Sequence, residues 1–332
     1  MKQIAVIGAG SWGTALAVIA ARAGHSVRLW SRSDAVVSSI NERRVNSRYL
    51  SATSIPDNVT ATGDIEAALQ QASMVLLAVP SHAARETLTA MTSRLTEDAI
   101  IVNVAKGIEI ESGKRISEIV KEVVTGSHRF VTLSGPSFAK EVVAGHPTAI
   151  VAASKDNAAA RAVQNDLSFE NLRIYTNADV VGTEIGGSVK NVMAIAAGMA
   201  DGLGFGANSV AALITRGLAE ITRLARREGA QMETLMGLAG LGDLVLTCTG
   251  NLSRNRFVGE ELGKGRTLVE ITAELSEVAE GINTARAVKK LADRAGLEMP
   301  ITNEVNAVLY DGKPAREAVS ELMSRPLREE RN

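Results

Sequence analysis

Residues 4–17 of the chain read IAVIGAGSWGTALA, and this stretch decides the fold. Gly8, Gly10 and Gly13 directly follow a short run rich in β-branched residues and precede apolar residues at helical spacing. In such a strand–turn–helix unit the first glycine permits a tight turn, the second lets the backbone approach a pyrophosphate, and the third allows close helix packing. The stretch predicts a dinucleotide-binding unit; the alternative is a glycine-rich turn without a ligand.

The alternation of short strands and helices continues to about Ile150. This pattern predicts an α/β fold whose N-terminal half is a Rossmann-type doubly wound parallel sheet, with ligands at the carboxyl ends of the strands. The expected strands cover residues 4–8, 26–30, 74–79, 99–104 and 130–133, with a last pair at 148–153 and 172–176, and the expected helices cover 11–23, 34–44 and 81–95.

After Thr176 the strand-like runs disappear, and segments rich in Ala, Leu, Met and Glu continue to the C-terminus. Residues 188–200 are apolar on nearly every face, as expected of a helix buried at a domain centre. We therefore predict a dinucleotide-binding domain over residues 1–177 and an all-helical substrate and catalytic domain over 178–332. Its expected helices cover 188–200, 209–228, 254–264, 277–295 and 301–310.

Composition limits the partners. The 332 residues include 36 basic and 37 acidic side chains, for a net charge of -1, so no summed field attracts nucleic acid or an anionic membrane. The single cysteine, Cys248, suits a reducing compartment and has no thiol neighbours for a metal cluster. We expect a cytoplasmic protein without a metal or a membrane span; apolar helices in the second half are compatible with a homodimer.

The end of the second expected strand bears on the choice of nicotinamide coenzyme. An Asp or Glu there would bind the ribose hydroxyls of NAD, but the chain has Ser31, Arg32 and Ser33. An arginine flanked by hydroxyls suits a 2′-phosphate, so we expect NADP(H) to be used at least as well as NAD(H). Alternatively Arg32 is a solvated surface side chain, and nearby Asp34 keeps NAD use open.

Two segments place polar groups at the ends of expected strands. Lys106 follows the strand that ends at Val104, where it would face the ligand crevice of a doubly wound sheet. The SGPSFA stretch at 134–139 follows the next strand and offers backbone donors and the Ser137 hydroxyl, although such a turn alone is weak evidence.

Lys190 lies inside the most apolar helix, where an unpaired ammonium is costly to bury. It could be a structural lysine in a salt bridge with a carboxylate such as Glu184 or Asp243. It could instead be a lysine whose pKa is lowered by burial, and by a nearby Lys106, into the range useful for general acid and base catalysis.

The last cluster combines residues 240–243 (GLGD) with residues 251–256 (NLSRNR), which open an expected helix. Ser253, Arg254 and Asn255 at a helix start suit a small phosphate, since backbone donors and a guanidinium converge there. Taken alone, Ser253 could equally be an ordinary N-cap.

Together these motifs resemble the bacterial-type NAD(P)-dependent glycerol-3-phosphate dehydrogenases over nearly the whole chain. The resemblance implies reduction of dihydroxyacetone phosphate to the sn-glycerol 3-phosphate used for phospholipid backbones. It rests on six ordered motifs: IGAGSWGTALA (7–17), NVAKGIE (103–109), LSGPSFAKEV (133–142), GGSVKNVMAIAAGMADGLGFGANS (186–209), GLGDLVLTCTGNLSRNR (240–256) and VAEGINTA (278–285).

The resemblance also implies roles for individual residues. It makes Lys190 the catalytic acid and base, with Asp243 orienting it and Lys106 stabilising negative charge on oxygen. The implied substrate contacts are Lys106, Gly135, Ser137, Lys190, Asp243, Ser253, Arg254 and Asn255. The implied coenzyme contacts, with the glycines Gly8, Gly10 and Gly13, are Ser11, Trp12, Arg32, Lys106, Ala139, Arg254, Val278 and Glu280.

Two other functions remain open from the residues themselves. A related two-domain hydroxy-acid dehydrogenase would also carry a lysine in a helical domain, but its substrate bears a carboxylate, which an arginine can hold as well as a phosphate. A non-catalytic nucleotide sensor would not require Lys190 or Lys106, and both are present.

Overall fold

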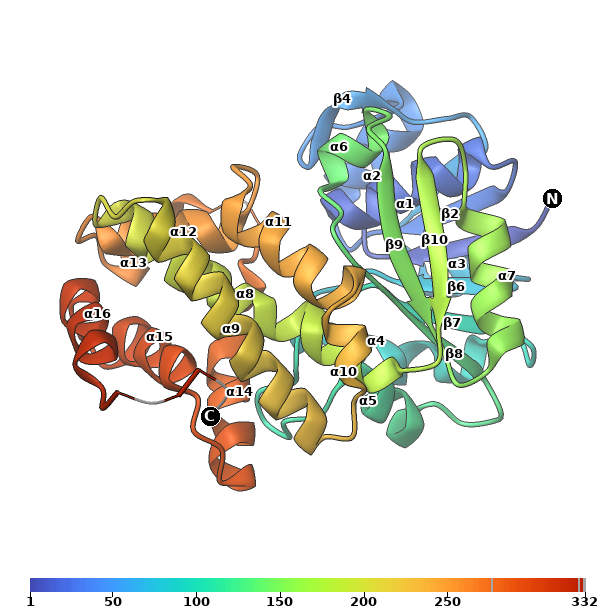
Figure 1. The fold of residues 1–332 in the computed structure, drawn as a ribbon. Helices are drawn as coiled ribbons and strands as arrows, with labels where there is room; N and C mark the ends of the chain where they lie inside the picture. The colour runs from blue at the N-terminus through green and yellow to red at the C-terminus, as the bar shows by residue number, and fades with distance from the viewer. Residues whose placement is uncertain (276, 328, 331–332) are drawn as a thin grey trace.

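The computed structural model describes residues 1–275, 277–327 and 329–330 and shows a sheet-containing N-terminal half beside a helical C-terminal half (Figure 1). The eight strands of the main sheet lie in the order β10-β9-β8-β7-β6-β1-β2-β5. The run from β5 to β8 has the strand order of a doubly wound dinucleotide fold. The bounds are β1 Gln3–Ile7, β2 Ser26–Trp30, β5 Val59–Thr62, β6 Met74–Leu77, β7 Ile100–Asn103, β8 Arg129–Ser134, β9 Thr148–Ala153 and β10 Leu172–Asn177.

The sheet departs from the predicted parallel arrangement at one junction. β9 runs antiparallel to β8, with Thr132 opposite Ala153, and then pairs in parallel with β10. The chain between β8 and β9 stays at the carboxyl end of the sheet, so β9 must run back along its neighbour. This connection leaves Gly135 and Ser137 at the edge where ligands of such sheets bind.

Helices cover both faces of this sheet. Side chains of β1 alternate between the two faces: Ile4 and Val6 join the core beneath α1, whereas Ala5 and Ile7 join the core beneath α4. The helices of this half are α1 Ser11–Arg22, α2 Asp34–Arg43, α3 Ile65–Leu69, α4 Ala84–Met91, α5 Ile116–Val123, α6 Ala139–Val143 and α7 Asn157–Leu167, with 3-10 turns at Ser81–Ala83 and Thr92–Arg94.

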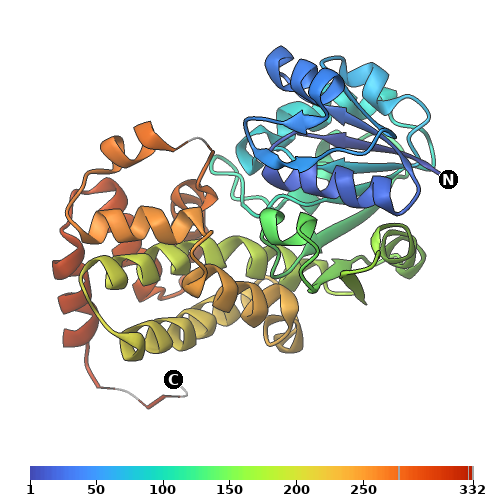
Figure 2. The same ribbon diagram turned by 90° about the horizontal axis from the view of Figure 1, so that it is seen from above.

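The C-terminal half is helical throughout its described residues, as predicted (Figure 2). Its centre is α8 Val180–Gly202, which is buried on nearly every face and packs against α9, α11, α12, α14 and α15. The other helices are α9 Ala207–Arg227, α10 Met232–Leu235, α11 Asp243–Thr249, α12 Arg254–Gly263, α13 Leu268–Glu274, α14 Glu280–Ala295, α15 Pro300–Tyr310 and α16 Ala315–Ser324, and a π-helical turn spans Leu238–Gly242.

Helices α8 and α12 touch backbone to backbone. A Cβ added at Gly198 of α8 would lie 2.0 Å from the Arg256 carbonyl oxygen, and one added at Gly259 of α12 would lie 2.0 Å from the Ile195 oxygen. No side chain separates the two helices at these points. The contact therefore fixes the start of α12 relative to the middle of α8.

The fold changes from strands to helices between Asn177 and Val180. Asp179 caps α8 through the Gly182 amide, 2.8 Å away, and its other oxygen accepts from the Gln231 amide, also at 2.8 Å. The domain division at residues 177 and 178 stays a prediction.

Among the described residues, no single helix is long and apolar enough to cross a membrane. One bent pair, Met232–Thr249 with Arg254–Gly263, passes on length and composition alone.

Candidate active site

A cleft of about 850 Å³ opens at the carboxyl ends of β1, β2, β6 and β7 and is lined by both halves of the chain. The predicted site residues that line it are Gly8, Gly10, Ser11, Trp12, Gly13, Arg32, Lys106, Ser137, Lys190, Ser253, Arg254, Asn255, Val278 and Glu280. Three other predicted residues, Gly135, Ala139 and Asp243, are not part of its wall. Ala139 begins α6 and packs against the sheet core.

The glycine-rich turn fits the pyrophosphate of a dinucleotide. Gly8 has φ +119°, and a Cβ there would lie 2.6 Å from the Ala78 carbonyl oxygen, so only glycine fits this turn. A Cβ on Gly10 would meet nothing within 4 Å, which leaves the backbone open toward the cleft. The first helical hydrogen bond of α1 is donated by the Thr14 amide, so the preceding amides remain available to an anion.

A hairpin that the sequence analysis missed supports this turn. It consists of β3 Val45–Asn46 and β4 Leu50–Ser54. The buried Asn46 side chain donates to the Ala9 carbonyl at 2.9 Å and to the Thr14 hydroxyl at 2.8 Å. The Ser11 hydroxyl donates to the Tyr49 carbonyl at 3.2 Å. A two-residue strand is too short to show a periodic pattern, so its sequence carried no signal.

Two lysines that line the cleft share one buried aspartate behind its wall. Lys190 Nζ lies 2.9 Å from Asp243 Oδ1, and Lys106 Nζ lies 2.7 Å from Asp243 Oδ2. Lys190 also donates to the Thr247 hydroxyl at 2.6 Å, while Lys106 donates to the Gly135 carbonyl at 2.8 Å. Of the two carboxylates considered for a salt bridge to Lys190, Asp243 forms it.

Glu184, the other candidate, lies elsewhere. It accepts hydrogen bonds from Arg115 Nη1 at 3.0 Å and from the Ser117 amide and hydroxyl at 2.8 and 2.5 Å. Its partners therefore belong to the start of α5, and it anchors α8 to the sheet-containing half.

The electrostatics leave Lys190 able to exchange a proton. Burial lowers the pKa of Lys190 to about 8, although Asp243 opposes the shift, and the nearby Lys106 charge lowers it further. Burial alone would raise the pKa of Asp243, but Lys106 and Lys190 outweigh it and keep that pKa below its usual value. Asp243 is therefore the anion shared by two cations.

The geometry leaves one donor of each ammonium for a ligand. An ammonium has three N–H groups, and the described residues supply two acceptors to Lys190 and two to Lys106. Both lysines line the cleft, so the remaining donors are available to an oxygen placed there. The arrangement can protonate an oxygen at one lysine and stabilise its charge at the other.

The start of α12 forms another part of the wall. Ser253 is the N-cap of α12, accepting from the Arg256 amide at 3.2 Å, and it also lines the cleft. Arg254, half exposed, pairs with Glu277.

The side-chain amide of Asn255 already has two protein partners. Its nitrogen donates to Asn191 Oδ1 at 2.9 Å, and its oxygen accepts from the Gly281 amide at 2.9 Å.

Several cleft residues escaped the sequence analysis. Thr247 lies four residues after Asp243, a helical spacing that could have identified it. Asn191 directly follows Lys190 and donates to the Lys106 carbonyl at 3.1 Å. Glu277 accepts hydrogen bonds from Ser11 and Arg254. Nothing in the sequence indicated these contacts between the two halves.

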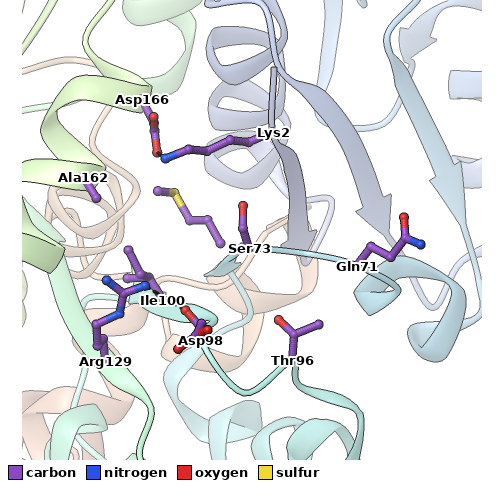
Figure 3. A pocket seen from close by; sticks show the side chains of 10 residues that line it. Lys2, Gln71, Ser73, Thr96, Asp98, Ile100, Arg129, Ala162 and Asp166 are labelled. Carbon is purple, nitrogen blue, oxygen red and sulfur yellow. Dashed lines mark hydrogen bonds and ion pairs between the residues drawn. The ribbon is translucent and has the colours of Figure 1, made fainter.

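A second pocket of about 380 Å³ lies at the opposite end of the sheet (Figure 3). Lys2 Nζ lies 2.7 Å from Asp166 Oδ2 there, and Arg129 donates to the Asp98 carbonyl at 2.8 Å. Both cations are thus already bound to protein oxygens. The larger cleft, where the free donors gather, is the better candidate for the active site.

Comparison with known proteins agrees with this geometry. The profile of the NAD-dependent glycerol-3-phosphate dehydrogenase N-terminus matches residues 3–160, and that of its C-terminus matches residues 179–320. A glycerol-3-phosphate dehydrogenase [NAD(P)+] of Koribacter versatilis is 54% identical over 330 residues, covering 98% of each chain. One of Geobacter sp. is 50% identical over 331 residues, covering 99% of each.

The solved structures agree as well. The crystal structure of glycerol-3-phosphate dehydrogenase from Coxiella burnetii superposes with a TM-score of 0.95 at 41% identity, covering 98% of this chain and 99% of that one. With both halves matched in order and a relative more than half identical, this chain belongs to the NAD-dependent glycerol-3-phosphate dehydrogenase family.

Proposed function

We propose that this enzyme interconverts sn-glycerol 3-phosphate and dihydroxyacetone phosphate with NAD(P)(H), and that Lys190 moves the proton. One observation carries the assignment of Lys190: the ammonium is buried at the cleft wall, paired with Asp243, and has a pKa of about 8. A group with such a pKa can donate and accept a proton near neutral pH.

The coenzyme, when bound, supplies the hydride in reduction and accepts it in oxidation. Lys190 protonates the substrate oxygen that becomes the alkoxide, and as the neutral amine it removes that proton in the reverse direction. Lys106 adds a positive charge beside the same oxygen. Asp243 holds both ammonium groups in place through its two oxygens, 2.9 and 2.7 Å away.

We assign the substrate phosphate to the start of α12. Ser253, Arg254 and Asn255 gather backbone and side-chain donors at one helix N-terminus. The Arg254 guanidinium would exchange its Glu277 partner for the phosphate. Gly135 and Ser137 complete the proposed substrate site: the Ser137 hydroxyl lines the cleft, whereas the Gly135 carbonyl positions Lys106.

We assign the coenzyme to the glycine-rich turn and the wall beside it. The pyrophosphate would lie on the free amides at the start of α1. Val278 and Glu280 reach the same cleft from the loop before α14 and the first residue of that helix. The full set of proposed coenzyme contacts is Gly8, Gly10, Ser11, Trp12, Gly13, Arg32, Lys106, Ala139, Arg254, Val278 and Glu280.

We further propose that the enzyme works in the cytoplasm, forms glycerol 3-phosphate for phospholipid synthesis and does not bind nucleic acid. The lone buried Cys248 and the near-zero net charge support the compartment and the last point. A homodimer stays part of the proposal, and light scattering of the purified protein tests it.

The test is oxidation of NADPH and NADH, followed by absorbance, with dihydroxyacetone phosphate and with a panel of keto acids. We expect turnover with dihydroxyacetone phosphate, and Lys190→Met should lower kcat by orders of magnitude while leaving coenzyme binding nearly intact. Lys155→Met, which removes an exposed lysine outside the cleft, is the matched control and should leave turnover unchanged.

Each outcome separates the alternatives. Near-normal turnover of Lys190→Met would refute the assignment of the proton donor. Activity with keto acids alone would indicate a hydroxy-acid dehydrogenase. Coenzyme binding without turnover of any substrate would favour a nucleotide sensor.

A further inference from the structure

Two arginines line the active-site cleft, and they come from different segments. Arg32 follows β2, and Arg48 lies in the turn of the β3–β4 hairpin, the blue loop at the top of Figure 1. Both side chains are exposed. Within the part of the chain that the structure describes, neither guanidinium has an ion pair or a hydrogen-bond partner; Arg48 only lies over the Tyr49 ring, 5.3 Å from its centroid.

The nearby Arg44 shows what a structural arginine does in the same hairpin. Its guanidinium donates to the carbonyls of Ile55, at 3.2 Å, and of Val59, at 3.0 Å, and also to that of Pro56. Arg44 thereby ties the base of the hairpin to the chain leading into β5. Arg48 makes no comparable bond to any residue that the structure describes, so the fold of the hairpin does not explain why an arginine stands at its tip.

The position of that tip is nevertheless fixed relative to the glycine-rich turn. Asn46 is fully buried and bonds to Ala9 and Thr14, and the Tyr49 carbonyl accepts from Ser11. The residues on either side of Arg48 are therefore held against the segment that binds the pyrophosphate. The Arg48 backbone keeps a set position near the place where the adenosine ribose follows the pyrophosphate in a doubly wound fold.

The local charge favours a dianion over a hydroxyl at this place. Asp34, the one acidic residue in the first turn of α2, has its carboxylate beside Gly63 and does not line the cleft. The acidic residues of the described cleft wall are Glu277 and Glu280. Glu277 is bound to Ser11 and Arg254, and Glu280 is bound to Ser81. Among the described residues, Arg32 and Arg48 thus line the cleft without a carboxylate paired to either guanidinium.

We propose that Arg48 and Arg32 together bind the 2′-phosphate of NADP(H), and that Arg48 is a determinant of coenzyme preference. This inference rests on the proposed use of the cleft by a nicotinamide coenzyme. Two guanidinium groups from separate segments can each donate two hydrogen bonds to a phosphate. The 2′-hydroxyl of NAD(H) offers no charge to either of them, so the two arginines favour NADP(H).

The test uses small probes with the full-length enzyme. Adenosine 2′,5′-bisphosphate carries the 2′-phosphate and 5′-AMP does not, and their affinities are measured by calorimetry at one ionic strength. We expect Arg48→Ala to weaken the bisphosphate by about tenfold to a hundredfold, the usual range for lost charge-assisted hydrogen bonds, and to change 5′-AMP far less. Arg48→Lys should retain part of the affinity.

Arg43→Ala is the matched control, because Arg43 is exposed, ends α2 and lies outside the cleft. It removes the same charge and should leave both affinities unchanged. In kinetics, Arg48→Ala should lower the ratio of kcat/KM for NADPH to that for NADH. An Arg48→Ala variant that binds both probes like the wild type, or weakens both equally, would overturn the proposal.

The two proposals fail separately. If the wild type binds the bisphosphate through Arg48 but does not turn over dihydroxyacetone phosphate, the assigned reaction is wrong and the inference about Arg48 stands. If turnover is normal but Arg48→Ala leaves the probe affinities and the NADPH to NADH ratio unchanged, the inference about Arg48 is wrong and the assigned reaction stands.

Discussion

Substitution Gly259→Ala tests whether the contact between α8 and α12 sets the active-site geometry. The added Cβ would lie 2.0 Å from the Ile195 oxygen and 2.9 Å from the Met199 nitrogen, and both atoms are backbone. Real Cβ contacts essentially never fall below 3.0 Å, so the helices must separate by about 1 Å. Overpacking of this kind costs roughly 1–3 kcal/mol of unfolding free energy.

The functional effect should exceed the loss of stability. Ser253, Arg254 and Asn255 lie at the start of α12, whereas Lys190 lies on α8, so the separation moves the proposed phosphate site away from the proton donor. A displacement of about 1 Å at a positioned group can cost about a hundredfold in rate. We therefore expect kcat to fall by about that factor, while coenzyme binding, most of whose proposed contacts lie in the other half of the chain, changes less.

Steady-state kinetics, coenzyme titration and urea unfolding of the same preparation measure the three quantities. Gly206→Ala is the control, because Gly206 precedes α9 with φ −83° and a Cβ there would meet nothing within 4 Å. It should behave like the wild type. A folded Gly259→Ala enzyme with near-normal kcat would refute the idea that this contact positions the site.

Three further predictions concern the charged residues. Reduction needs the Lys190 ammonium, so its rate should fall as pH rises through about 8, whereas oxidation needs the neutral amine, so its rate should rise over the same range. Rates in either direction that do not change across this pH range would exclude Lys190 as the titrating group. Asp243→Asn removes the carboxylate that raises the Lys190 pKa, so the fall in the reduction rate should begin at lower pH. A fall at the wild-type pH would contradict the view that Asp243 raises the Lys190 pKa. Glu184→Ala leaves the Arg115 cation without its buried partner and should lower the free energy of unfolding by about 3 kcal/mol, measured by urea denaturation. An unchanged unfolding midpoint would disprove this loss.

The sequence was sufficient where local pattern decides structure. The glycines after β1 predicted the turn, and the apolar surroundings of Lys190 marked that lysine as one needing a partner. The choice between Glu184 and Asp243 as that partner depended on how α5 and α11 pack against α8, which local pattern does not contain. The antiparallel β9 was missed for the same reason, since strand direction follows from the path of the connection after Ser134.

The hairpin at residues 45–54 could not be predicted, because it is held by single side chains rather than by a periodic core. Asn46 is the clearest case: a buried amide whose partners, Ala9 and Thr14, lie more than thirty residues earlier. Glu277 is similar, since its partners Ser11 and Arg254 come from different halves.

If Arg48 determines coenzyme preference as proposed, that hairpin also places this determinant apart from the groups that handle the proton. It is anchored by bonds to the segment around α1 and to the chain entering β5, and Lys190 and Asp243 lie on the other half of the chain. Substitutions in its turn can therefore accumulate without altering the groups that handle the substrate. A lineage whose cells shift their balance of NADPH and NADH could then follow part of that shift through this exposed turn while its chemistry stays the same.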